Sequence, residues 1–208
     1  MLQIIPALLV AITVVIQCLA VQMSRYRLSR MNARPPHHGL ALMSGMLAAA
    51  AIILRLYQND SAVGVLFMTI MTGCMTLMTL TDAASCRLPR PFTIMYLISG
   101  SAFRLWQGDW LTGLCSAGFW FLLLLLFRQY TSYRRKTETI GLGDVFLIAG
   151  IAIWSPPGDI PWIVATAAGG ALLYLWCNGQ RRITRELPFG PFLCASQYAF
   201  TFYPGGLW

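Results

Sequence analysis

The chain has 208 residues, of which 57% are hydrophobic and only 11% are charged, and its mean hydropathy is +0.63. This composition excludes a water-soluble globular domain and is typical of a protein that crosses a membrane several times. The net charge of +8 is informative through its distribution along the chain, which indicates membrane topology. We therefore expect membrane lipids around the protein and no nucleic-acid partner.

Eight apolar runs follow one another along the chain, and a membrane-spanning helix needs about 20 apolar residues. Their approximate bounds are 2–23, 40–54, 62–81, 91–105, 111–127, 145–154, 162–176 and 187–203. The sequence therefore predicts an all-α fold, a polytopic membrane bundle of about eight transmembrane helices. Residues 1–208 are expected to form a single integral-membrane domain.

Basic residues alternate between the two sets of loops. Successive loops of one set hold four, two, four and three Lys and Arg residues, whereas the other set holds only Arg55 and Arg104. Because Lys and Arg are enriched in cytoplasmic loops, the first set is predicted to be cytoplasmic. Both chain termini then lie outside, and Asp82 and Asp144 both lie at the inner face of the membrane.

Two acidic residues occupy matching positions at the ends of apolar runs. Asp82 closes the run 62–81, and Asp144 ends the sequence Ile140-Gly141-Leu142-Gly143-Asp144, just before the run 145–154. A carboxylate at the edge of hydrocarbon is costly and is by default a candidate functional group. Gly141 and Gly143 have no side chains and allow another backbone to approach Asp144 closely, so we predict that they contact a substrate.

If the fold brings Asp82 and Asp144 together, the two carboxylates do not both ionise easily. One then takes a proton from water while the other, still protonated, gives a proton to a leaving amine. This is the chemistry of an aspartic peptidase. The sequence therefore predicts Asp82 and Asp144 as a catalytic pair, with no metal and no cofactor for peptide cleavage.

Three ordered motifs carry a resemblance to a known family. They are Thr81-Asp82 with Leu88-Pro89, then Gly141-Leu142-Gly143-Asp144, then Pro188-Phe189-Gly190-Pro191-Phe192. From about Leu40 onward the chain resembles the type IV prepilin peptidases, which are aspartic peptidases of the bacterial inner membrane. The resemblance implies that Asp82 and Asp144 are catalytic. It implies that the domain 1–208 cuts the basic leader of a prepilin or pseudopilin at the cytoplasmic face, for a type IV pilus or type II secretion assembly.

The chain departs from the larger members of that family in its first loop. Those members carry a four-cysteine zinc domain there and also methylate the new N-terminus, whereas residues 24–39 contain no cysteine. We therefore expect a short form with peptidase activity and weak or absent methyl transfer. S-adenosylmethionine is expected as a cofactor only if methyl transfer is retained.

Other interpretations remain open at this point. Asp82 and Asp144 would also suit helix caps at the inner interface. A presenilin-like or signal-peptide-peptidase-like G-x-G-D protease is a second alternative, although that class needs Pro-Ala-Leu where this chain has Pro188-Phe189-Gly190. A non-enzymatic membrane component of a pilus or secretion assembly is the third.

Overall fold

The computed structural model describes residues 4–31, 38–57, 61–135, 141–177 and 187–201. They form eight α-helices, and the described residues contain no strand. In chain order the helices are α1 (Ile4–Arg30), α2 (His38–Tyr57), α3 (Ala62–Ser85), α4 (Arg90–Gln107), α5 (Trp110–Arg135), α6 (Leu142–Trp154), α7 (Ile160–Cys177) and α8 (Gly190–Thr201). Each helix corresponds to one predicted apolar run, so the predicted all-helical bundle is confirmed.

The helix ends differ from the predicted ones. Helix α1 continues to Arg30 and α5 to Arg135, although the apolar runs end near residues 23 and 127. Arginine favours helix, and the end of an apolar run removes only the hydrophobic packing of a helix, not its backbone hydrogen bonds. Much of the two basic loops predicted after these runs is therefore helical.

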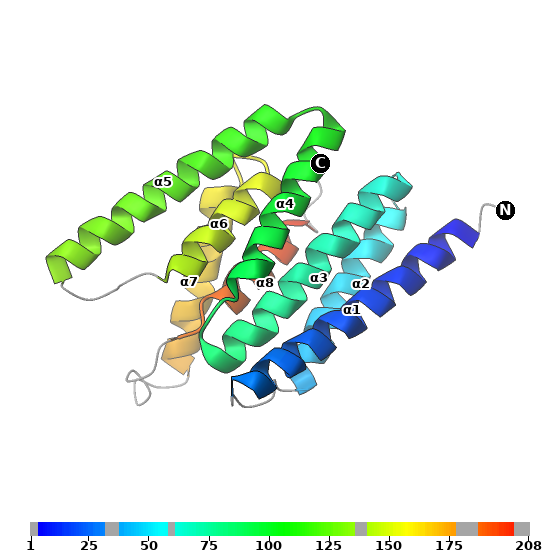
Figure 1. Cartoon of the computed structure of the whole chain (residues 1–208), viewed down its shortest axis with the longest axis horizontal. Coiled ribbons are helices and arrows are strands. Elements are labelled where there is room, and N and C mark those ends of the chain that lie inside the picture. Colours follow the sequence, from blue (N-terminus) through cyan, green and yellow to red (C-terminus); the bar gives the residue numbers. More distant parts are fainter. Residues whose placement is uncertain (1–3, 32–37, 58–60, 136–140, 178–186, 202–208) are drawn as a thin grey trace.

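Helix α3 is the centre of the bundle. It packs against α1, α2, α4 and α8. Figure 1 shows α1 and α2 on one side of α3, with α4, α6 and α5 following one another on its other side. Most of α3 from Met68 to Asp82 is buried. Consequently α3 contacts little lipid, and its C-terminal end lies inside the protein.

Helix α6 packs very closely on α4. A Cβ atom at Gly150 would lie 2.6 Å from Cδ1 of Tyr96, and one at Gly100 would lie 2.8 Å from Cγ2 of Ile153. Small residues allow helix backbones to approach in this way inside a membrane. The indole of Trp154 stacks on Phe103 with a centroid distance of 5.2 Å, and its Nε1 donates to the carbonyl of Tyr96 at 3.1 Å. These contacts fix α6 along α4.

Buried polar side chains pair across the bundle. Gln17 Nε2 donates to Thr72 Oγ1 at 3.1 Å and joins α1 to α3. The Tyr96 hydroxyl donates to Gln197 Oε1 at 2.6 Å and joins α4 to α8. A buried polar group is costly unless it is hydrogen-bonded. Such pairs therefore favour one register of the helices over others.

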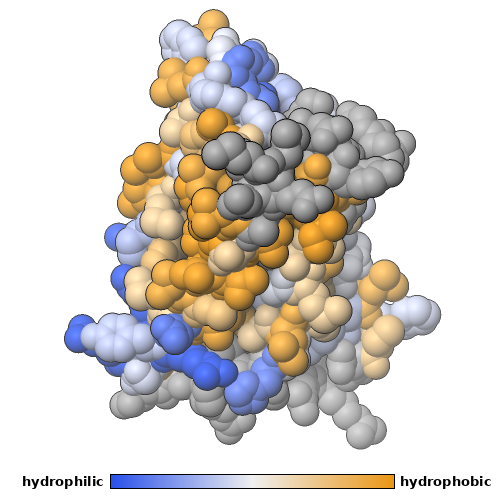
Figure 2. Space-filling view, turned by 90° about the vertical axis from the view of Figure 1, so that its right-hand side faces the viewer, coloured by the Kyte–Doolittle hydropathy of each residue, from blue (hydrophilic) through white to orange (hydrophobic). Residues whose placement is uncertain are grey.

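The surface of the bundle is apolar over a wide area. Figure 2 shows hydrophobic residues across the middle of the face that lies to the right in Figure 1, with hydrophilic residues gathered above and below them. Four described helical segments are long and apolar enough to cross a membrane: Leu8–Arg30, Ala62–Ser85, Trp110–Arg134 and Ile160–Cys177. An exposed apolar surface of this extent is unsuited to water. The chain is a membrane protein.

Candidate active site

The first carboxylate lies where α3 ends. Helix α3 ends at Ser85, and Cys86 adopts a left-handed conformation with φ 49°. The N–H of Cys86 donates to the carbonyl of Asp82 at 2.7 Å, which closes the last helical turn. Asp82 is only 4% exposed. The end of α3 therefore holds this carboxylate inside the protein.

The Asp82 carboxylate is held by the first residue of α8. The backbone N–H of Gly190 donates to Asp82 Oδ2 at 2.8 Å. A Cβ atom at position 190 would lie 2.8 Å from the same oxygen, so any larger residue would displace the carboxylate. The N-terminus of a helix also favours a negative charge because its first N–H groups lack intrahelical partners.

The second carboxylate lies in the first turn of α6. Gly141 precedes the helix with an extended backbone and caps it without a side chain. A Cβ atom at Gly141 would lie 3.2 Å from Asp144 Oδ2, and one at Gly143 would lie 2.8 Å from the Cβ of Leu88. Gly143 therefore allows the G-x-G-D segment to pack against the Leu88-Pro89 segment that follows α3. The structure gives Gly143 a packing role, and its contact with a substrate stays a prediction.

Asp82 and Asp144 line one cleft of about 800 Å³. Gly141 and Gly143 line it too, so all four predicted site residues are brought together. The two arginines Arg87 and Arg90 add basic groups to the wall, and much of the remaining surface is apolar. The cleft is built from the end of α3, the starts of α4 and α6, α5, α7 and the segment before α8. It therefore joins all three sequence motifs.

Several residues of the site could not be assigned from the sequence. Gly190 belongs to the Pro188–Phe192 motif. This motif is part of the resemblance to the family, but the sequence predicted no role for any of its residues. Phe189 and Leu88 line the cleft with the acids, as does Cys86. Within the described part of the chain, no group of three or more His, Cys, Asp and Glu side chains has an arrangement suited to a metal ion.

The chain was compared with known proteins. A model of the type IV leader peptidase family matches residues 69–176. The chain is 33% identical over 175 residues to a prepilin leader peptidase/N-methyltransferase of Burkholderia pseudomallei (strain 1026b), a match covering 79% of this chain and 53% of the relative. It is also 35% identical over 75 residues to the leader peptidase HopD of Escherichia coli, covering 33% of this chain and 48% of that protein. No solved structure matches.

The family match includes both Asp82 and Asp144 and covers slightly more than half of the 208 residues. The chain spans about half the length of the curated relatives that it matches. The resemblance seen in the sequence motifs is confirmed by these comparisons. The chain belongs to the type IV leader peptidase family.

Proposed function

We propose that the chain is an aspartic endopeptidase that removes the leader of a prepilin or pseudopilin. The observation that carries this proposal is the meeting of Asp82 and Asp144, from different helices, in one cleft. Helix caps need no partner carboxylate, whereas acid–base catalysis needs two carboxyl groups near one reacting bond. Membership of the leader peptidase family favours this function over the presenilin-like and non-enzymatic alternatives.

The proposed reaction uses the two carboxyl groups in opposite protonation states. One carboxylate takes a proton from water as the water oxygen bonds to the scissile carbonyl carbon. The protonated carboxyl group then gives its proton to the leaving nitrogen, and the carbon–nitrogen bond breaks. The products are a new carboxyl terminus on the leader and a free amine on the mature protein. The next cycle starts with the proton on the other carboxyl group.

Substrate entry follows from the position of the cleft. Its wall contains the end of α3 and the start of α6, at the end of the bundle where the sequence places the basic loops. We propose that this end faces the cytoplasm of a bacterium, in its inner membrane, with both chain termini outside. The substrate leader would reach the acids from the cytoplasm. Gly141 and Gly143 would then lie beside its extended backbone.

We propose that peptide cleavage needs no cofactor. The relative from Burkholderia pseudomallei is named as both a peptidase and an N-methyltransferase, but the internal segment 24–39 of this chain has no cysteine. Methyl transfer is therefore proposed to be weak or absent, and S-adenosylmethionine would serve only methyl transfer.

Co-expression with candidate prepilins tests this function. Mass spectrometry of the substrate should show a new N-terminus with the wild-type protein and none with Asp144→Asn, at equal membrane yield. A labelled methyl donor in the same culture reports methylation. Absence of cleavage with every prepilin and pseudopilin tried, or cleavage by Asp144→Asn at the wild-type rate, would refute the proposal. Methyl incorporation at the rate of cleavage would refute the expected lack of methyl transfer.

A further inference from the structure

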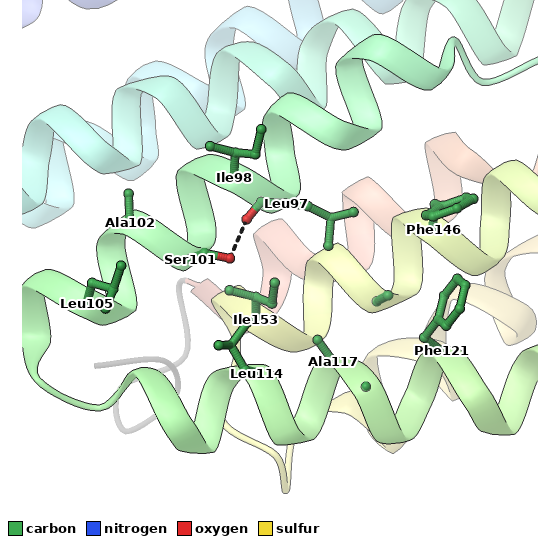
Figure 3. Close-up of a pocket in the computed structure, with 12 residues that line it drawn as sticks. Leu97, Ile98, Ser101, Ala102, Leu105, Leu114, Ala117, Phe121, Phe146 and Ile153 are labelled. Carbon is green, nitrogen blue, oxygen red and sulfur yellow. Dashed lines mark hydrogen bonds between the residues drawn. The ribbon is translucent and has the colours of Figure 1, made fainter.

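A second hollow lies between α4, α5 and α6, with a volume of about 610 Å³. Nearly all of its lining is apolar (Figure 3). The one hydroxyl among the lining residues, that of Ser101, donates to the carbonyl of Leu97 in its own helix at 3.0 Å. This hollow, which we call the α5 groove, therefore offers no free hydrogen-bond donor to a polar ligand. Its chemistry suits a hydrocarbon surface.

The α5 groove continues the acid cleft along three helices. On α4, Thr93 lines the cleft, and Leu97, Ser101 and Leu105 line the groove. These four residues are spaced four apart and share one helical face. Phe146 of α6 lines both hollows. The two hollows thus adjoin at Phe146, whose ring lies 5.2 Å from that of Phe121, with the acids on the cleft side of this boundary.

Helix α5 shows the same continuity. Leu124 lines the cleft, whereas Phe121, Gly118 and Leu114 line the groove. The groove reaches Ile153 on α6, nine residues beyond Asp144, which corresponds to about 13 Å along the helix axis. The groove itself runs from Phe146 to Ile153, about 10 Å, which would accommodate about two turns of another helix.

The groove has small residues where such a helix would lie. Ala102, Ala117, Gly118 and Ala149 are among its lining residues. A Cβ atom at Gly118 would meet no other atom within 4 Å, so the space beside it is open. Small residues allow a helix to approach closely in a membrane, where association depends on packing contacts.

We infer that the α5 groove binds the apolar helix of the substrate immediately after the scissile bond. This inference rests on the proposed function, and it adds that the substrate carries an apolar helix directly after the bond that is cut. The groove begins at Phe146, which also lines the acid cleft, so a helix seated in it with its N-terminal end at Phe146 would present that end to the cleft that holds Asp82 and Asp144. The groove would fix the depth of the scissile bond in the membrane. The acids would cut the extended peptide that precedes the bound helix.

A bulky residue at position 118 tests the groove. Gly118→Phe would fill the open space, and Gly169→Phe is the matched control because a Cβ atom at Gly169 on α7 also meets nothing within 4 Å. With detergent-solubilised protein and full-length prepilin, we expect KM to rise about tenfold or more in Gly118→Phe, the loss expected when one large apolar side chain is no longer buried. Gly169→Phe should match the wild type. A wild-type KM in Gly118→Phe would overturn the inference.

Photo-crosslinking separates this inference from the proposed function. Each of the first twelve residues after the scissile bond of the prepilin would be replaced in turn by benzoylphenylalanine. The Asp144→Asn peptidase would bind each of these prepilins without cleaving it. Crosslinks to residues 97–121 and 146–153 are expected. Crosslinks confined to α1, α2 or α7, or none at any position, would overturn the groove assignment while wild-type cleavage still supports the peptidase. A wild-type protein that cuts no prepilin would instead overturn the proposed function.

Discussion

The two ends of α6 differ in how they are held. At its C-terminal end, Arg104 of α4 is 7% exposed and donates to the carbonyls of Ile153 at 2.7 Å and Ser155 at 3.0 Å. Arg104 also pairs with Asp109 at 3.3 Å. At its N-terminal end, Asp144 faces a cleft of about 800 Å³. One end of α6 is therefore fixed by charge-assisted hydrogen bonds, and the other is open.

This difference shows how a helical bundle can place two acids beside a cleft and keep its packing elsewhere. The last carbonyls of a helix lack intrahelical partners and are costly when buried. Arg104 supplies donors to two backbone carbonyls at that end of α6, and the stacked ring of Trp154 adds apolar contacts. The closed end holds α6 in position. The open end can then hold two carboxylates beside a cleft.

Among changes that leave both acids in place, Gly190→Ala is expected to have the largest effect on cleavage. The added methyl group would lie 2.8 Å from Asp82 Oδ2 and would force the carboxylate to move. A displacement of about 1 Å in a catalytic group lowers activity by up to about 100-fold. We expect cleavage of prepilin to slow by about 10- to 100-fold in that variant. The measurement is the initial rate by mass spectrometry.

Gly169→Ala is the control for Gly190→Ala, since a methyl group there meets nothing within 4 Å. It should cleave at the wild-type rate. Wild-type turnover by Gly190→Ala would show that the position of Asp82 does not depend on the start of α8.

At the C-terminal end of α6 we expect a change to lower stability and leave cleavage unchanged. Arg104→Met keeps an apolar stem but removes the donors to Ile153 and Ser155, and each buried acceptor left without a partner costs about 1 to 3 kcal/mol. We expect the free energy of unfolding to fall by about 2 to 5 kcal/mol, with cleavage by the folded protein near the wild-type rate. Thermal unfolding in detergent measures the change in stability. A cleavage assay below the unfolding transition measures the activity of the folded protein. Unchanged thermal stability, or lost cleavage at unchanged stability, would contradict the comparison.

The smallest effect is expected for a test of membrane topology, which should leave cleavage unchanged. The two ends of α6 should lie at opposite sides of the membrane. In a background without native cysteines, Asp109→Cys marks the closed end, and Ser132→Cys, beyond the cleft-lining Leu124 on α5, marks the open end. An impermeant thiol reagent on intact cells should label the first variant and not the second, because the basic loops are predicted to be cytoplasmic. The reverse labelling would invert the proposed topology.

The sequence was sufficient for the eight helices of the described residues, and it predicted that the two acids lie at one side of the membrane. Apolar runs separated by basic loops predicted eight helices, and an even number of spans between Asp82 and Asp144 predicted that they lie at the same side. Both inferences depend on hydropathy and charge, which act locally along the chain. The catalytic role of the two acids remains a prediction.

The sequence was not sufficient for contacts between distant segments. The hydrogen bond from Gly190 to Asp82 joins residues 108 apart, and it depends on how α8 packs on α3. Arg104 was counted among the few basic residues of the outer loops, yet it is buried against the end of α6. Two of its partners are the backbone carbonyls of Ile153 and Ser155, which carry no signal in a sequence. The α5 groove is likewise a product of helix packing.

The central claim is that Asp82 and Asp144 act as one catalytic unit. The most direct measurement compares the residual cleavage rates of Asp82→Asn, Asp144→Asn and the double variant, with Asp109→Asn as a control at the closed end. Each single change at the open end should slow cleavage by at least about 100-fold, because acid–base catalysis contributes about 10² to 10⁴. The effects of substituting residues that act as a unit do not add, so the double variant should be no slower than the slower single variant. Asp109→Asn should retain activity. A double-variant loss equal to the product of the two single losses, or a near-wild-type rate for either single variant, would contradict the account.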